Sequence, residues 1–160
     1  MPWRAAFTIN AFSDISRRGP ASQVTDRANP EEGNRKIVMA SLLIVDDDQS
    51  VLDLLRDLFS AEHLCHTVAT AEEAVGRLDS HDYDVIVTDV SMPGMSGEDL
   101  LGFVKAHRPG TPVLFISGAA DEGRAGRLLA RGAFDYLRKP FSLEEIAGRV
   151  ARAVEHRRPA

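Results

Sequence analysis

Short apolar runs alternate with longer amphipathic stretches from residue 41 to residue 157 of this 160-residue chain. The short runs are apolar at successive positions, which is typical of strands that are buried on both faces. They predict strands over 42–45, 65–70, 85–87, 113–116 and 134–137. In the stretches that follow, apolar residues recur every three or four positions, as on one face of a helix. These stretches predict helices over 49–61, 71–78, 97–107, 121–130 and 143–154.

Strands that alternate with helices imply parallel βαβ units with right-handed crossovers. We therefore expect an α/β fold, a five-stranded parallel sheet with helices on both faces. The 65–70 run is the least apolar, so it is expected at an edge of the sheet. In open sheets of this kind, ligands bind beyond the carboxyl ends of the strands, near the point where the strand order reverses. The residues that directly follow the strands are therefore the first candidates for a functional site.

Residues 1–38 differ from the rest of the chain. They are rich in Ser, Arg, Asn, Pro and Gly and show no sustained period, which predicts a disordered or weakly ordered extension. Met39 stands directly before the first expected strand. A translation start at Met39, with a non-native extension upstream, is one explanation of this segment, and a regulatory or targeting tail is the other. A single domain is expected over 39–160.

Charge and composition exclude several classes of protein. The net charge is −5, and the 120 residues after position 40 carry thirteen Lys/Arg against twenty Asp/Glu. This acidic body argues against direct binding of nucleic acid. No stretch approaches the roughly 18–20 apolar residues of a membrane span, and the N-terminus lacks the features of a signal peptide. The single cysteine, Cys65, excludes an internal disulfide and a cysteine-based zinc cluster, so a cytoplasmic location is expected.

Chemically complementary residues follow four of the expected strands. Three acids, Asp46 to Asp48, follow the first strand, and Asp89 follows the third. Ser117 and Lys139 follow the fourth and fifth strands. Singly, each has an ordinary structural explanation, such as a helix cap or a solvated turn. Together, the clustered carboxylates would repel one another unless a cation lay between them, and oxygen ligands suit Mg²⁺ or Mn²⁺.

This set contains the parts that phosphoryl transfer requires: a nucleophile, a divalent cation and donors for the phosphoryl oxygens. Asp89 can be the nucleophile and form an acyl phosphate, with Asp46 and Asp47 as metal ligands. The Ser117 hydroxyl and the Lys139 ammonium can each contact a phosphoryl oxygen. Gly118 has no side chain to block access of the phosphoryl group and adds a backbone N–H.

Four segments carry a resemblance to a known family: LLIVDDDQSVLDLL, VIVTDVSMPGMSGEDLL, VLFISGAAD and GAFDYLRKPFSLEEI. They look like the signature blocks of the receiver domains of two-component response regulators, and the resemblance covers residues 41–157. It implies a flavodoxin-like (βα)5 fold with strand order 2-1-3-4-5. It also implies that Asp89 is phosphorylated by a phosphohistidine on a sensor histidine kinase or a histidine phosphotransfer protein.

The resemblance assigns the metal ligands and the lysine. Asp46 and Asp47 match the acidic pair of the family, and the backbone carbonyl of Ser91 matches a further metal ligand beside Asp89. Lys139 matches the active-site lysine, and the following proline matches one that is preceded by a cis peptide bond in the family.

The resemblance also assigns a switch. Ser117 matches the Ser/Thr switch position and Tyr136 the aromatic one. Phosphorylation would draw Ser117 towards the phosphate, turn the Tyr136 ring inwards and repack the face formed by the fourth helix, the fifth strand and the last helix. We expect a downstream protein to dock on this face.

Two other functions fit this set of residues less well. A phosphatase of the haloacid dehalogenase type would need a second aspartate two residues beyond Asp89, where this chain has Ser91. A pseudo-receiver that works without phosphorylation is disfavoured by the complete set of site residues. Little sequence follows Lys139, so we expect a single-domain regulator that signals to a partner or passes the phosphoryl group along a relay. A receiver fragment of a longer regulator or hybrid kinase is the alternative. In either case the domain is no conventional turnover enzyme, because it would catalyse only its own phosphoryl transfer and autodephosphorylation.

Overall fold

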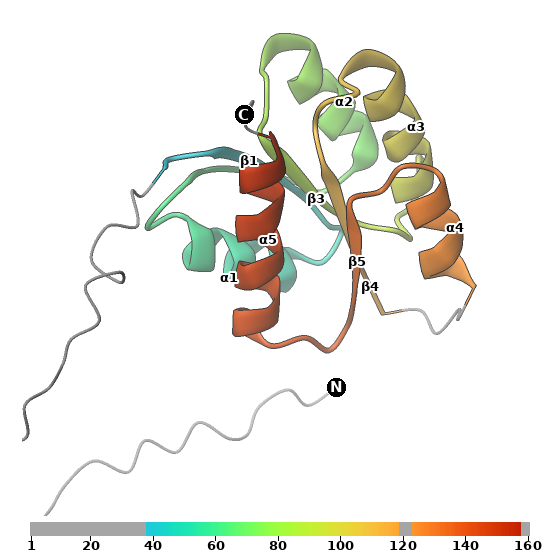
Figure 1. Cartoon of the computed structure of the whole chain (residues 1–160). Coiled ribbons are helices and arrows are strands. Elements are labelled where there is room, and N and C mark those ends of the chain that lie inside the picture. Colours follow the sequence, from blue (N-terminus) through green and yellow to red (C-terminus); the bar gives the residue numbers. More distant parts are fainter. Residues whose placement is uncertain (1–37, 119–122, 158–160) are drawn as a thin grey trace, which may run out of the picture. The chain divides into compact units, whose positions relative to one another are not determined.

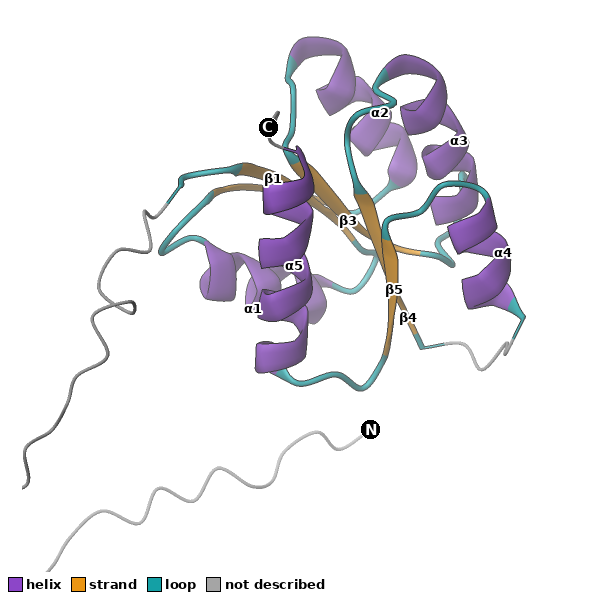
Figure 2. Ribbon diagram, viewed as in Figure 1, coloured by secondary structure: helices purple, strands orange, loops and turns teal. Residues whose placement is uncertain are grey.

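The computed structural model describes residues 38–118 and 123–157, which form one parallel sheet with helices on both of its faces (Figures 1 and 2). The strands are β1 (Ser41–Val45), β2 (Leu64–Val68), β3 (Val85–Asp89), β4 (Val113–Ser117) and β5 (Asp135–Arg138). The helices are α1 (Gln49–Phe59), α2 (Ala71–Ser80), α3 (Gly97–His107), α4 (Arg124–Ala130) and α5 (Leu143–Arg157). Apart from Val38, the expected extension 1–38 lies outside the described residues.

The sheet has the expected order, β2-β1-β3-β4-β5, and all of its pairings are parallel. The prediction of a flavodoxin-like fold is confirmed, as is the place of β2 at an edge. The chain passes from β1 outwards to β2 and then returns past β1 to β3. The order therefore reverses between β1 and β3, and the carboxyl ends of these two strands flank the point where such sheets bind ligands.

Each face of the sheet has its own apolar core. Alternate side chains of the strands point to opposite faces, so successive residues of one strand belong to different cores. On one face the strands pack against α2, α3 and α4, with Phe115 fully buried. On the other face they pack against α1 and α5, with Leu114 and Ile116 fully buried. Helices therefore cover both faces, which explains why the central strands are mainly apolar and do not alternate with polar residues.

Some element boundaries differ from those expected. The run 65–70 was expected to be a strand to its end, but β2 ends at Val68. Thr70 instead caps α2, because its side chain accepts a hydrogen bond from the Glu73 N–H at 3.1 Å. The helix expected over 121–130 begins at Arg124 in the described part of the chain, and residues 121 and 122 lie outside it.

The start of α3 determines how the chain leaves β3. Ser96 and Asp99 form a reciprocal capping box at this end of the helix. The Gly97 N–H donates to the Val90 carbonyl at 2.8 Å. A Cβ at position 97 would lie 2.1 Å from the backbone carbonyl oxygen of Asp89. Only glycine allows this close approach, which holds the helix start against the end of β3.

Among residues 38–118 and 123–157, no helix has both the length and the apolar character that crossing a membrane requires.

Candidate functional site

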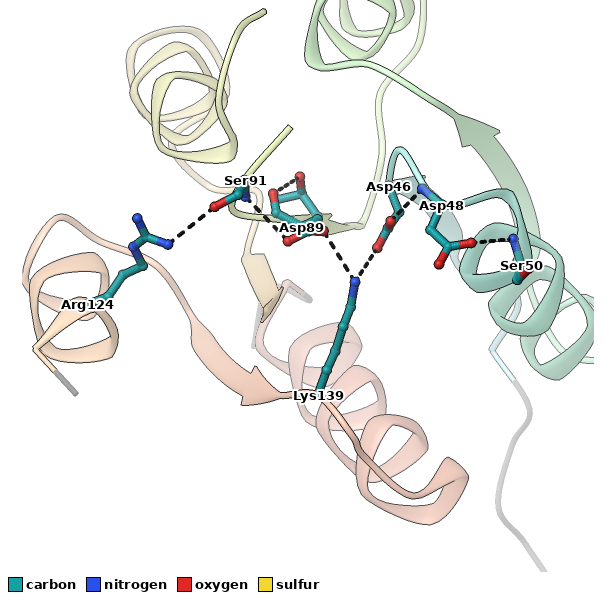
Figure 3. A network of polar contacts seen from close by, with 8 residues as sticks. Asp46, Asp48, Ser50, Asp89, Ser91, Arg124 and Lys139 are labelled. Atoms are coloured by element: carbon teal, nitrogen blue, oxygen red, sulfur yellow. Dashed lines mark hydrogen bonds and ion pairs between the residues drawn. The ribbon is translucent and has the colours of Figure 1, made fainter. Parts of the chain in front are cut away.

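The acids and the lysine predicted from the sequence meet at one edge of the sheet (Figure 3). Asp46 follows β1 and is fully buried, and Asp89 is the last residue of β3 with 8% exposure. Asp47 is exposed beside them, and Lys139 follows β5. The parallel register places the carboxyl ends of these strands together, although Lys139 is 93 positions from Asp46 in the sequence.

The Lys139 ammonium bridges the two buried acids. Its Nζ lies 3.0 Å from Asp46 Oδ2 and 3.2 Å from Asp89 Oδ2. The backbone N–H of Lys139 donates to the Ser117 carbonyl at 2.9 Å, which ties this residue to the end of β4. The peptide bond between Lys139 and Pro140 is cis, as the family resemblance implied. Lys139 therefore neutralises part of the acid cluster from the β5 side.

Burial and charge shift the pKa values of this group. Burial raises the pKa of Asp46, although the Asp48 N–H at 2.9 Å and the Lys139 ammonium both favour the charged form. Burial also acts to lower the pKa of Lys139. The hydrogen bonds and negative charges of Asp46 and Asp89 outweigh that effect, so the pKa of Lys139 is raised. An ionised Asp46 therefore remains costly even with Lys139 in place, and further positive charge would be favourable.

The donor set fits a hard divalent cation. Carboxylate oxygens of Asp46, Asp47 and Asp89 lie within 4.8 Å of one another. All of these donors are oxygens, and three carboxylates face one ammonium, so Mg²⁺ or Mn²⁺ suits both the ligand chemistry and the charge. Asp48 is not one of these donors. Its side chain accepts from the Ser50 N–H at 2.9 Å and caps α1, which was the ordinary explanation for an acid at this place.

Ser91, Ser117 and Gly118 lie at the same edge of the sheet as the acids, and their functional roles stay predictions. Ser91 is exposed in the loop after β3, and its N–H lies 3.4 Å from Asp89 Oδ1. Ser117 ends β4 and is buried, whereas Gly118 is exposed. A Cβ at position 118 would lie 3.9 Å from the Lys139 side chain, an ordinary contact. Glycine is therefore not required there by packing within the domain.

Tyr136 lies in β5, away from the acids. Its side chain is partly buried and packs against the core on the α2–α3–α4 side of the sheet. Its backbone carbonyl lies 3.4 Å from Arg149 Nη1 of α5. Tyr136 therefore contacts the faces that α4 and α5 cover, and its role as a switch stays a prediction.

Two features of the site were not anticipated from the sequence. Arg124, the first residue of α4, reaches Ser91, with 3.3 Å between Nη1 and Oγ (Figure 3). The contact joins residues 33 positions apart, and no local pattern marks it. The second feature is Gly97, whose missing side chain lets α3 start against Asp89. A glycine directly after the helix-capping Ser96 was the available signal.

Comparison with known proteins places these features in a family. The family model for the response regulator receiver domain matches residues 42–151. The DNA-binding transcriptional regulator NtrC of Salmonella typhimurium is 39% identical over 114 residues, which are 71% of this chain and 24% of NtrC. The transcriptional regulatory protein TcrA of Mycobacterium tuberculosis is 37% identical over 144 residues, 87% of this chain and 56% of TcrA. The chain thus spans about a quarter of the NtrC relatives and about half of TcrA.

The fold matches solved structures of isolated receivers. A BeF3-activated DrrB receiver domain has a TM-score of 0.69 and 30% identity, with 74% of this chain and 99% of that chain covered. The matched residues include β1 from Leu42 onwards, the other four strands, Lys139 and the two acids that it bridges. The chain belongs to the response regulator receiver domain family of two-component systems.

Proposed function

We propose that this receiver accepts a phosphoryl group on Asp89 from a phosphohistidine of a sensor histidine kinase or a histidine phosphotransfer protein. The observation that carries the proposal is the position of the Asp89 carboxylate. It ends β3 at the reversal point of the sheet, with Oδ2 held 3.2 Å from Lys139 Nζ and Oδ1 on the side of the Ser91 loop. A signalling module, rather than a turnover enzyme, is what the family represents.

In the transfer step, an oxygen of the Asp89 carboxylate attacks phosphorus in line with the N–P bond of the donor. The new O–P bond forms as the N–P bond breaks, and its electron pair stays on the imidazole nitrogen. The other ring nitrogen of the donor keeps its proton, so the donor histidine becomes a neutral imidazole. Hydrolysis reverses the loading: water attacks phosphorus, the O–P bond breaks, and Asp89 returns to a carboxylate with release of inorganic phosphate.

The other residues of the cluster would stabilise this transfer. A divalent cation, held by Asp46, Asp47, Asp89 and the Ser91 carbonyl, would neutralise the charge of the transferring phosphoryl oxygens. The Lys139 ammonium is already within 3.2 Å of Asp89, so a short movement brings it to a phosphoryl oxygen. The Ser117 hydroxyl would donate to a second oxygen, and Gly118 would leave the entry path open.

Phosphorylation would change the packing of the face formed by α4, β5 and α5. Movement of Ser117 towards the phosphoryl group would free space for the Tyr136 ring, which packs on that side of the sheet. The phosphoryl group can shift this equilibrium because it interacts with only one of the two arrangements. A downstream protein would bind the repacked face.

We infer that the receiver acts as a single domain in the cytoplasm, on a protein partner or within a phosphorelay. A second candidate is a receiver that belongs to a longer regulator, and the coverage favours it: NtrC, a DNA-binding regulator, is about four times longer than the matched part. In that case DNA would be bound outside the receiver, because the receiver itself is acidic. Regulated DNA binding by a purified longer product of the same gene would decide for the second candidate.

Beryllofluoride binding and labelling by acetyl phosphate, both with Mg²⁺, test the central proposal. Wild type should bind and be labelled, whereas Asp89→Asn should do neither. Asp57→Asn, which alters an exposed carboxylate of α1, is the matched control and should behave like wild type. Equal labelling of the Asp89→Asn variant would refute the assignment of the phosphoacceptor.

A further inference from the structure

A second cation lies near the phosphoacceptor, beside the Ser91 loop. Arg124 Nη1 lies 3.3 Å from Ser91 Oγ, and the Ser91 N–H lies 3.4 Å from Asp89 Oδ1. Figure 3 shows Arg124 extending from α4 towards Ser91, with Asp89 directly beyond it and Lys139 reaching Asp89 from β5. Ser91 therefore contacts the guanidinium through its hydroxyl, and through its backbone N–H it approaches the carboxylate oxygen that Lys139 does not hold.

Arg124 is also tied to α3 through a shared carboxylate. Its Nε lies 3.7 Å from Glu98 Oε1, and Arg131 Nη1 lies 3.0 Å from Glu98 Oε2. Glu98 stands in the first turn of α3, while the two arginines stand at the start of α4 and just after its end. The side chains are 25–50% exposed, and ion pairs at such exposure are weak enough to be exchanged for a better partner.

The phosphoryl group would be that better partner. It brings about 1.5 to 2 negative charges and several acceptor oxygens, whereas Ser91 offers one neutral hydroxyl and Glu98 one charge that Arg131 shares. A guanidinium binds phosphoryl oxygens through two parallel hydrogen bonds, which a hydroxyl acceptor cannot provide. The Arg124 side chain is long, and its head group already lies beside the loop that follows Asp89.

We propose that Arg124 is a further phosphoryl-binding residue, which exchanges Ser91 and Glu98 for the phosphoryl group on Asp89. This inference rests on the proposed function. Because Arg124 is the first residue of α4 and Glu98 belongs to α3, the exchange loosens the tie between these helices at the phosphorylated end of α4. The site thereby gains a direct connection to α4, separate from the one through Ser117 and Tyr136.

Beryllofluoride affinity in Mg²⁺ tests the proposal on the full chain. Arg124→Gln should bind about three- to tenfold more weakly, the range for one exposed charge-assisted contact. Arg131→Gln is the matched control: it removes the same charge from the same carboxylate partner but has no contact with Ser91, and it should stay within about twofold of wild type. Glu98→Gln should bind at least as tightly as wild type, because Arg124 loses one charged partner that competes with the phosphoryl group.

Backbone amide NMR shifts provide a second measurement. Beryllofluoride should shift the signals at the start of α4 in wild type, and these shifts should be reduced in Arg124→Gln while those near Lys139 persist. Wild-type affinity of Arg124→Gln, or an equal loss in Arg131→Gln, would overturn this inference alone. Failure of wild type to bind beryllofluoride would overturn the proposed function together with it.

Discussion

Replacing Lys139 by methionine should destabilise the domain, and the effect should depend on Mg²⁺. Methionine keeps an unbranched stem but removes the charge. In the folded protein, Asp46 is 0% and the Asp89 side chain 12% exposed, and each has an oxygen within 3.2 Å of the ammonium. Removal of one member of a buried ion pair costs about 3–5 kcal/mol, because its partner stays buried without compensation. Since the Lys139 side chain is 24% exposed, about 2–4 kcal/mol is expected here.

Urea unfolding followed by circular dichroism, in EDTA and in MgCl2, measures this loss. A loss of 3 kcal/mol in a domain of this size also lowers the Tm by about 10 °C. Mg²⁺ should restore more stability to Lys139→Met than it adds to wild type, because the cation then faces three carboxylates without a competing ammonium. Arg138→Met, which removes the exposed neighbouring cation of β5, is the control and should change little. Equal stability of Lys139→Met and wild type in EDTA, or equal gains from Mg²⁺, would refute this account of the site.

Three further perturbations probe the fold and the switch. Gly97→Ala should lower the free energy of unfolding by more than about 2 kcal/mol, because the new Cβ would meet a backbone oxygen at 2.1 Å. Gly102→Ala, in open space on α3, should raise it by about 0.5–1 kcal/mol. Equal urea midpoints for the two variants would contradict this. Burial, then the positive charges of a nearby arginine and histidine, lower the pKa of His66 below its usual 6.5. Below pH 6.5 the His66 side chain therefore binds a proton more readily in the unfolded state than in the folded state. The free energy of unfolding of wild type should fall as the pH decreases through this range. His66→Gln should flatten that slope in thermal unfolding between pH 7.5 and 5.5, and an unchanged slope would disprove the assignment. Beryllofluoride should shift the NMR ring signals of Tyr136 less in Ser117→Ala than in wild type, and an equal shift would exclude the proposed switch.

The secondary structure could be predicted because each element has a local signal. The central strands are buried on both faces and therefore mainly apolar, and the helices repeat their apolar residues every three or four positions. The errors lie at the ends of elements, where single side-chain contacts decide. Thr70 is β-branched, which favours a strand, but its hydroxyl caps α2 instead.

The composition of the site could be predicted for a similar reason. Parallel strands bring their carboxyl ends to one edge, so the residues after β1, β3, β4 and β5 were expected to meet before any distance was known. The contacts among them could not be predicted. Asp46 and Asp48 are both acids after β1, yet one is fully buried against Lys139 and the other caps α1. Only the packing of α1 against the sheet separates these two roles.

The sequence by itself determined the parallel α/β fold, the family, and the residues that gather at the active edge, because hydrophobic periodicity and topology depend on residue type and order alone. The tertiary structure decided which charges touch: Lys139 bridging Asp46 and Asp89, and Arg124 reaching Ser91. These contacts join residues 33 to 93 positions apart. They depend on strand register, helix placement and side-chain reach to within an ångström, and no local pattern in a sequence carries that information.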